Sequence, residues 1–451
     1  MLIDKRYFVE KLIGEGGSSR VYRVLDKVSG RVLALKQLQV ENYSDEDRFS
    51  FEQEFLRLKK LAHPNIIKVY DYGFAENAQP YFTMNYYPLG NFARWWQGRS
   101  DIDLFVKLIV DVLSALQYLH EQGVLFRDLK PANILIEEKD GEFRAVLSDF
   151  GLAQEFLEGT QNSRAGSYHY VSPEAIRNWQ LDPRSDLYSL GATMFELLAG
   201  RPVFEKESVR DVLLAHLNEK PERVRKFNQI VPFQLDDLIQ KLLSKKPEER
   251  FRSAAEVVEE INRFKFVSRK YHLPDKLVRL WSGSFVGRNE VVEEMHRLAD
   301  EASRERALRT FVIQGDHGVG KTRIVREFVT RRQVLGNGVF WFSCSDFHDV
   351  PNGLILELLR AVGVTVRMEE IELTAEEEEF WRFLLIHSEK NWDVSIRFND
   401  ITHFFDICLD LFKKFVAASV EENRTPLIFV FDDLQEASLQ AMEFLRYLVY
   451  R

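Results

Sequence analysis

The sequence reads VLFRDLKPANILI at residues 124–136 and LSDFGLA at residues 147–153, and these two stretches decide the fold. Each sets polar side chains into a mainly apolar background. Phosphoryl transfer needs a carboxylate that orients the accepting hydroxyl, a cation for the transferred charge, and hard oxygen ligands for Mg²⁺. The two stretches supply one group for each role: Asp128, then Lys130, then Asn133 and Asp149 as oxygen ligands. This spaced set predicts a phosphoryl-transfer site.

Upstream of these stretches lie a glycine-rich turn and a lysine that needs a partner. The run GEGGSSRVYRV places Gly14 and Gly16 between strand-like segments, where the backbone can approach phosphates closely. Lys36 lies in the apolar run LALKQL, which is unfavourable unless its charge is paired. Glu54, in the helical pattern of residues 45–61, is the candidate partner. Taken alone, these residues are also compatible with an ordinary turn, a snorkelling lysine and a surface glutamate.

In this order along the chain, the motifs resemble those of the protein kinase family. Strand-like runs are expected at residues 7–13, 21–25, 32–38 and 81–84, and helical patterns dominate from Leu104 onward. Both features agree with the α+β bilobal kinase fold. The resemblance implies a kinase domain at residues 1–265, with an N-lobe at 1–85 and a C-lobe at 86–265.

The same resemblance assigns roles at the site. It implies ATP and Mg²⁺ as cofactors and proteins as substrates, with Lys36 on the α- and β-phosphates and paired with Glu54. Asp128 would orient the acceptor and Lys130 would stabilise the transferred charge. The ATP-binding positions that it implies are Gly14, Gly16, Val21, Ala34, Lys36, Met84 and Tyr87.

The motifs DLKPAN and GSYHY resemble serine/threonine kinases, in the style of the bacterial eukaryotic-like enzymes. Arg127 before the catalytic aspartate is typical of kinases whose activation loop is phosphorylated. The candidate phosphorylation sites are Thr160, Ser163 and Ser167, with unmodified loop residues as the alternative. Phe126 stands where the family usually has histidine, at a cost on the order of 1 kcal/mol for one lost hydrogen bond. The site is still expected to be active.

Three further residues are expected to stabilise the C-lobe without taking part in chemistry. Glu174 resembles the glutamate that pairs with an arginine near the end of the kinase fold, and Arg250 in KKPEERF is that arginine. Asp186, in the helical run RSDLYSLGATMFELLAG, resembles the buried aspartate that braces the catalytic loop.

A second nucleotide site is predicted near residue 320. The run VIQGDHGVGKTRIV matches GxxxxGK[ST], a glycine-rich turn at a helix N-terminus whose amides hold phosphate. A buried strand is expected before it at residues 307–315. LIFVFDD adds two carboxylates, one to support Mg²⁺ and one to polarise water, or else both cap a helix. The residues are Gly315, Gly320, Lys321, Thr322, Asp432 and Asp433.

With FVGRNEVVEEM upstream, this region resembles the α/β P-loop NTPase domain of AAA-related signalling ATPases of the STAND type. The resemblance implies a domain at residues 284–451 after a linker at 266–283. Parallel sheets of this kind normally continue beyond a strand such as LIFVFDD, so we expect the domain to be C-terminally truncated.

Composition limits the remaining choices. The net charge of −9, from 61 Lys and Arg against 70 Asp and Glu, argues against a nucleic-acid-coating protein. Two cysteines support no disulfide framework. The sequence has no run of about 18 apolar residues, so no membrane span is predicted. A cytoplasmic location is expected.

The sequence therefore predicts a serine/threonine kinase in a signalling pathway, with the P-loop module as its regulator and a route to self-association. Two alternatives remain open. One is a kinase-like scaffold that binds ATP without transferring phosphate. The other is a signalling ATPase or transcriptional regulator with low kinase activity.

Overall fold

The computed structural model describes most of the chain. It leaves out residues 17, 40–43, 76–77, 150–166, 268, 274–286, 306, 348–349, 351, 367–370, 387–400, 424–426 and 451.

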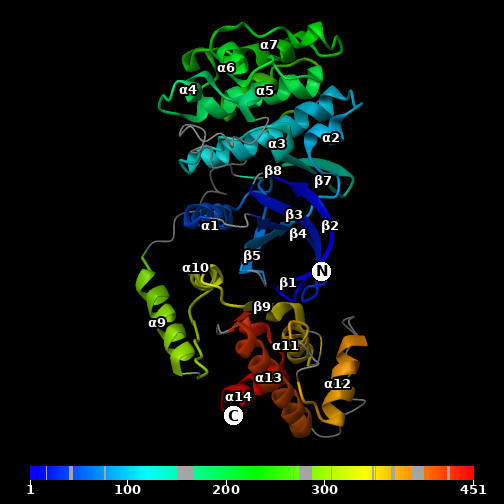
Figure 1. Cartoon of the computed structure of the whole chain (residues 1–451), viewed down its shortest axis with the longest axis vertical. Helices are drawn as coiled ribbons and strands as arrows, with labels where there is room; N and C mark the ends of the chain where they lie inside the picture. Colours follow the sequence, from blue (N-terminus) through cyan, green and yellow to red (C-terminus); the bar gives the residue numbers. More distant parts are fainter. Residues whose placement is uncertain are drawn as a thin grey trace.

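The N-terminal part is one six-stranded sheet with antiparallel neighbours, in the order β1-β2-β3-β4-β6-β5 (Figure 1). The predicted strands in this region are confirmed, and β1 and β5 are additions. The elements are β1 (Leu2–Ile3), β2 (Tyr7–Glu15), β3 (Ser19–Asp26), β4 (Val32–Leu38), α1 (Asp45–Lys60), β5 (Val69–Phe74) and β6 (Pro80–Asn85).

Helix α1 packs on strands β5 and β6 of this sheet. Its start is held by a capping box, in which Ser44 Oγ accepts from Asp47 N at 3.1 Å and Asp47 Oδ2 accepts from Ser44 N at 3.0 Å. The ring of Phe55 lies 5.2 Å from Tyr72 and 5.9 Å from Phe82, centroid to centroid. Aromatic packing therefore positions the helix that carries Glu54.

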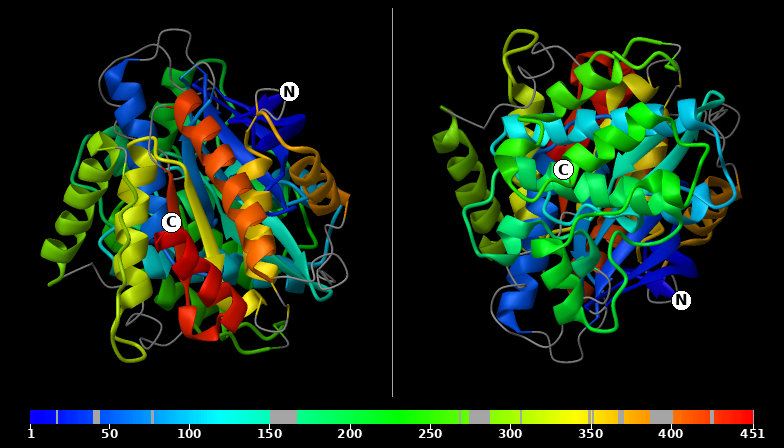
Figure 2. Two further views of the ribbon diagram at one scale, coloured as in Figure 1. Left: turned by 90° about the horizontal axis from the view of Figure 1, so that it is seen from below. Right: turned by 90° about the horizontal axis from the view of Figure 1, so that it is seen from above.

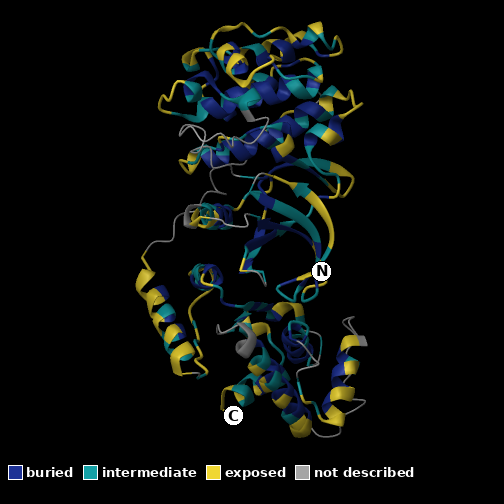
Figure 3. Ribbon diagram, in the orientation of Figure 1, coloured by how far each residue is buried: buried dark blue, intermediate teal, exposed yellow. Residues whose placement is uncertain are grey.

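The next part is mostly helical and has a continuous apolar core (Figure 3). Its elements are α2 (Phe92–Trp96), α3 (Ile102–Glu121), β7 (Ile134–Lys139), β8 (Glu142–Leu147), α4 (Pro173–Ile176), α5 (Pro183–Ala199), α6 (Val209–Asn218), α7 (Phe233–Leu242) and α8 (Ala254–Ile261). Helices α5 and α7 pack closely at Gly191, where an added Cβ would lie 2.8 Å from Leu242 Cβ. Strands β7 and β8 form a hairpin that the sequence analysis did not predict.

The C-terminal part has helices on both faces of a short parallel sheet. Its elements are α9 (Asn289–Glu305), α10 (Lys321–Val334), β9 (Val339–Ser343), α11 (Gly353–Gly363), α12 (Ala375–Ile386), α13 (Ile401–Asn423), β10 (Ile428–Asp432) and α14 (Leu439–Tyr450). Strands β9 and β10 pair in parallel. Phe340 and Phe342 join the core under α11 and α13, whereas Val430 joins the core under α9 and α10. This alternation gives the expected α/β layering.

The prediction of a buried strand at residues 307–315 is wrong. This segment has no strand assignment, and Leu308 and Val312 are 60% and 68% exposed. Phe311 and Ile313 still pack against the core of α9 and α10. Apolar content alone does not make a strand, because a strand also needs a neighbour for its backbone, and no described strand pairs with this segment.

The N-terminal sheet lies between the helical part and the C-terminal α/β part (Figure 1), which are seen in front when the molecule is viewed from its two ends (Figure 2). Helix α10 contacts both β5 and α1. At the start of the expected linker, Asn262 Nδ2 donates to Tyr271 O at 2.8 Å, and Phe266 and Leu273 pack on the helical core. No helix among the described residues is both long and apolar enough to cross a membrane.

Candidate active site and phosphate loop

The loop before β7 brings the predicted catalytic residue Lys130 and the predicted Mg²⁺ ligand Asn133 to the carboxylate of Asp128. Lys130 Nζ donates to Asp128 Oδ2 at 2.8 Å. Asn133 Nδ2 donates to the same Asp128 oxygen at 2.9 Å and also to Asp128 O at 2.9 Å. The side chain of Asp128 is thus held in place by two neighbours on its own loop.

Asp186 on α5 holds the backbone of this loop through hydrogen bonds. Its carboxylate accepts from Phe126 N at 2.9 Å and Arg127 N at 2.8 Å. His120 Nε2 lies 2.7 Å from Asp186 Oδ2. The predicted brace is confirmed, and it uses the backbone of Phe126, whose ring is 1% exposed. Phenylalanine in place of histidine therefore leaves the loop attached to its brace.

A second cluster forms around Lys36 in the N-terminal sheet. Its Nζ lies 2.7 Å from Glu54 Oε1 and 2.6 Å from Asp149 Oδ1, and the lysine is 3% exposed. Burial by itself lowers the pKa of Lys36, but the charges of Asp149 and Glu54 outweigh it, so the pKa is raised above its ordinary value. Lys36 is paired, as its apolar surroundings require.

The two clusters meet at the β7–β8 hairpin. Ser148 N donates to Asn133 O at 2.9 Å, and Ile134 pairs with Leu147, so Asn133 and Asp149 lie at adjoining strand ends. An amide and a carboxylate oxygen suit Mg²⁺, which binds through one or two protein oxygens plus substrate phosphates. The described residues hold no group of three or more His, Cys, Asp or Glu for an all-protein metal cage. This donor set therefore fits Mg²⁺ bound together with a nucleotide.

The predicted ATP-binding residues of the sheet are neighbours. Gly14 pairs with Val21, Val21 with Lys36, and Ala34 with Met84 across β2, β3, β4 and β6. Two others lie just outside this ladder: Gly16, whose N donates to Ser19 O at 2.9 Å, and Tyr87, to which Asn85 Nδ2 donates at 3.3 Å. The structure thus places the seven positions along the β2–β3 turn, on strands β2, β3, β4 and β6, and just after the end of β6.

The candidate phosphorylation sites and the predicted Glu174–Arg250 pair follow Asp149 in the sequence. Thr160 and Ser163 lie outside the described residues, and only the backbone of Ser167 is described, at the start of the 3₁₀ turn Ser167–Tyr170. Beyond it, Arg250 Nη1 and Nη2 donate to the Glu174 carboxylate at 2.6 and 2.8 Å. The predicted Glu174–Arg250 pair is confirmed.

The glycine-rich run at residues 315–320 forms a phosphate loop at the N-terminus of α10. Gly318 and Gly320 have φ of 81° and 92°, a region that favours glycine, and α10 starts at the next residue. Lys321 Nζ donates to Gly315 O at 2.9 Å and to Asp316 O at 3.0 Å. The lysine thereby ties the two ends of the loop together.

The carboxylates of β10 reach this loop from across the sheet. Thr322 Oγ1 donates to Asp432 Oδ1 at 3.0 Å, although 110 residues separate them. Asp433 follows with φ of 54° and accepts from Gln435 Nε2 at 3.1 Å. The structure thus brings Thr322 and Asp432 together, while Asp433 is turned into the start of the next helical turn.

Comparison with known families agrees with this geometry. A model of the protein kinase domain matches residues 7–262, more than half of the chain. The chain belongs to the protein kinase family. A model of the AAA ATPase domain matches residues 284–451. This member of the family therefore joins a kinase domain to an AAA ATPase domain.

Bacterial serine/threonine kinases are among its relatives. Serine/threonine-protein kinase pkn3 of Myxococcus xanthus is 37% identical over 273 residues, which cover 56% of this chain and 48% of the relative. PrkC of Bacillus subtilis is 32% identical over 273 residues, covering 58% of this chain and 41% of the relative. PknB of Mycobacterium leprae is 31% identical over 265 residues, covering 56% and 42%. The chain spans less than half the length of these relatives.

Sequence reasoning missed two supports of the kinase site. His120 belongs to none of the motifs in the sequence, and its contact with Asp186 spans 66 residues. Ser148 follows β8 and donates a hydrogen bond to Asn133 O, but in the sequence it is marked only by its place before Asp149. Hairpin pairing of β7 with β8 was the signal that could have found Ser148.

Proposed function

We propose that this chain is a serine/threonine kinase that transfers the γ-phosphoryl group of ATP to protein hydroxyls in a signalling pathway. The observation that carries the proposal is the contact of Lys36 Nζ with both Glu54 Oε1 at 2.7 Å and Asp149 Oδ1 at 2.6 Å. Kinases require this lysine–glutamate pair beside the metal-binding aspartate. The names of the bacterial relatives support the serine/threonine class.

In the proposed reaction, Asp128 accepts a hydrogen bond from the substrate hydroxyl and takes its proton. The hydroxyl oxygen then bonds to the γ-phosphorus as the bond to the β–γ bridging oxygen breaks and ADP leaves. Lys130 is placed beside Asp128 to stabilise the transferred charge, and Lys36 holds the α- and β-phosphates. Mg²⁺, held by Asn133 and Asp149, would supply charge neutralisation on the phosphates.

The decisive test is transfer of labelled γ-phosphate to a generic basic protein, with ATP and Mg²⁺. Asp128→Asn is expected to lower the rate by roughly a hundredfold or more, because it removes the proton acceptor. Asp140→Asn is the matched control, since Asp140 is exposed in the β7–β8 turn with φ of 54°, which asparagine tolerates. Equal rates in wild type and Asp128→Asn would overturn the proposal. ATP binding without transfer would favour a scaffold.

We further propose that the AAA ATPase region is a second nucleotide-binding module that regulates the kinase. The hydrogen bond from Thr322 Oγ1 to Asp432 Oδ1 supports it, because phosphate loops hold Mg²⁺ through a hydroxyl and a carboxylate in this arrangement. The proposed bounds are residues 1–265 for the kinase, 266–283 for the linker and 284–451 for the second module. Self-association through this module and a cytoplasmic location complete the proposal.

The second site has its own test. Equilibrium binding of a fluorescent ATP analogue should give two sites in the wild type and one in Lys321→Ala, because that lysine reaches the phosphates. One site in both proteins would refute the second module.

A further inference from the structure

One helix links the two candidate nucleotide sites. Helix α10 begins at Lys321 in the phosphate loop and ends at Val334, so its 14 residues span about 21 Å. Val334 is 8% exposed and belongs to the apolar core of the kinase domain, together with Phe55 and Tyr72. The end of α10 is therefore part of the N-terminal lobe's packing, while its start is part of the phosphate loop.

A polar contact fixes the same end of α10 to the sheet. Gln333 Nε2 donates to Asp71 Oδ1 of β5 at 2.8 Å, across 262 residues of sequence. The other oxygen of Asp71 accepts from Tyr7 OH at 3.0 Å and lies 3.1 Å from Arg6 Nη2. Gln333 thus completes a network that belongs to the kinase sheet.

The loop after α10 extends this contact along β5. A Cβ added at Gly336 would lie 3.5 Å from the ring of Phe74, so this ring lies close to the glycine. Helix α11 makes a separate contact, in which Arg360 donates to the carbonyls of Lys27 and Val28 in the β3–β4 turn. The second module therefore holds the N-terminal lobe at two places.

On the kinase side, this surface is continuous with the helix that carries Glu54. The ring of Phe74 lies 5.6 Å from Tyr72, which in turn lies 6.3 Å from Phe51 and 5.2 Å from Phe55, centroid to centroid. Phe51 and Phe55 flank Glu54 on α1. Packed aromatic contacts thus connect the docked end of α10 with the Lys36–Glu54 pair.

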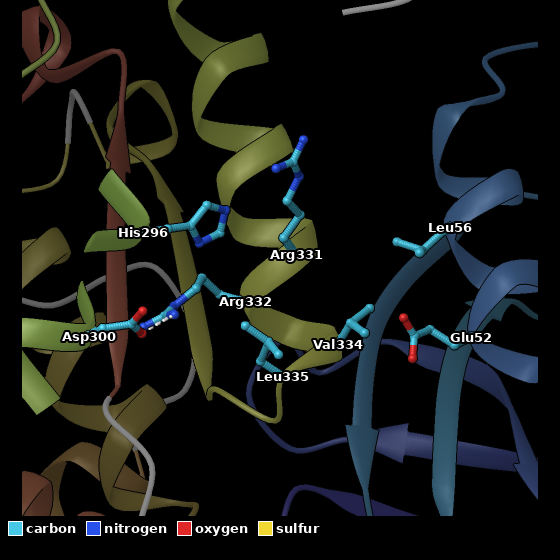
Figure 4. A pocket seen from close by; sticks show the side chains of 8 residues that line it. All are labelled: Glu52, Leu56, His296, Asp300, Arg331, Arg332, Val334 and Leu335. Atoms are coloured by element: carbon cyan, nitrogen blue, oxygen red, sulfur yellow. Dashed lines mark hydrogen bonds and ion pairs between the residues drawn. The ribbon is translucent and has the colours of Figure 1, made fainter. Parts of the chain in front are cut away.

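Helices α1 and α10 are in contact over only part of their length. A cavity of about 340 Å³ separates Glu52 and Leu56 of α1 from Arg331 and Val334 of α10 (Figure 4). Support from α10 therefore reaches α1 through β5 as well as through their direct contact, and the cavity leaves α1 space to shift when that support is removed. Arg332 extends from the cavity wall to Asp300 on α9, at 2.6 Å.

We propose that nucleotide at the phosphate loop activates the kinase by holding α10 docked on β5, which keeps α1 where Glu54 pairs with Lys36. The docked helix, the formed loop with Thr322 on Asp432, and the Lys36–Glu54 pair occur together in this structure. A ligand that binds the formed loop shifts the population toward this arrangement. The inference depends on the proposed kinase function only in the experiment that measures phosphate transfer.

The first test is a double-mutant cycle on phosphate transfer by the full chain. Lys321→Ala, which empties the loop, and Gln333→Ala, which removes the docking bond, should each slow transfer about fivefold, the lower end of typical allosteric couplings. The double variant should be no slower than either single one. Leu439→Asp on α14, at a 73% exposed position far from the contact, is the control that should retain the wild-type rate. Effects that multiply in the double variant, or no effect of Gln333→Ala, contradict the coupling.

The second test needs no kinase activity, so it separates failure of the coupling from failure of the proposed function. Hydrogen exchange of the α1 amides is compared with and without a non-hydrolysable ATP analogue. Protection lost in Lys321→Ala is the part that depends on the phosphate loop. The wild type should show this loop-dependent protection of the α1 amides, and Gln333→Ala should abolish it. Equal protection of α1 in wild type and Lys321→Ala overturns the proposal, whether or not the chain transfers phosphate.

Discussion

Lys36 Nζ lies 2.6 Å from Asp149 Oδ1, although 113 residues separate the two in sequence. The same ammonium group lies 2.7 Å from Glu54 Oε1. One buried cation therefore joins the sheet, helix α1 and the end of β8. This three-way contact gives the first prediction, since its removal affects both stability and chemistry.

Lys36→Met should destabilise the chain by about 3 kcal/mol, because it leaves the buried Glu54 without its cation. Adding Glu54→Gln should restore much of that stability, because the substitution removes the buried negative charge that faces Lys36 in the wild type. Phosphate transfer should stay lost in both variants. Chemical denaturation and labelled-phosphate transfer measure the two effects. A double variant no more stable than Lys36→Met would contradict this account of the pair.

Arg250→Gln should lower the free energy of unfolding by roughly 3–5 kcal/mol, because Glu174, 3% exposed, loses a two-pronged partner. The matched control is Arg263→Gln, since Arg263 is 72% exposed and pairs with Glu260 at the surface. A surface pair of that kind contributes about 1 kcal/mol or less. Similar losses in the two variants would mean that burial does not govern the Glu174–Arg250 pair.

His216 should make the free energy of unfolding decrease as the pH is lowered from about 6.5 to about 3. Burial lowers the pKa of His216 to about 3, with a smaller effect from Lys245, whereas the unfolded chain titrates near 6.5. In this window the unfolded state binds a proton that the folded state does not, so stability falls as pH falls. His216→Gln should flatten the slope by up to about 1.4 kcal/mol per pH unit. Urea denaturation at several pH values measures it, and an unchanged slope contradicts the assignment.

Thr322→Ala should weaken Mg²⁺-dependent binding of nucleotide to the second module without affecting the kinase site. The reason is that Thr322 Oγ1 and Asp432 share one hydrogen bond at the phosphate loop. Analogue binding with and without Mg²⁺ checks this, and Thr330→Ala on the same helix is the control, since Thr330 Oγ1 donates back to Arg326 O within the helix. Equal Mg²⁺ dependence in Thr322→Ala and wild type would exclude the proposed role.

The sequence could predict what short motifs and periodicity encode. The apolar run at residues 32–38 and the helical spacing of α3 and α5 indicated the right elements, and the motif order indicated the kinase fold. The phosphate loop was predicted because a glycine-rich turn before a helix is local. The strand expected at residues 307–315 failed because strand pairing depends on distant neighbours.

Contacts between distant segments were beyond the sequence. Nothing in the motifs pairs Gln333 with Asp71, and glutamine at the end of an amphipathic helix normally indicates a solvated position. The dependence of α1 on packing from β5 also arises only when Tyr72 and Phe74 are brought beside each other in three dimensions. The kinase site could therefore be predicted, whereas its connection to the second module could not.

Asp128 is proposed to serve phosphate transfer to serine and threonine hydroxyls. This role is tested most directly by phosphoamino-acid analysis of a protein substrate labelled from γ-labelled ATP, with wild type and Asp128→Asn side by side. The account predicts labelled phosphoserine or phosphothreonine with the wild type and almost none with Asp128→Asn. Label confined to tyrosine, or label that is equal in the two proteins, would contradict it.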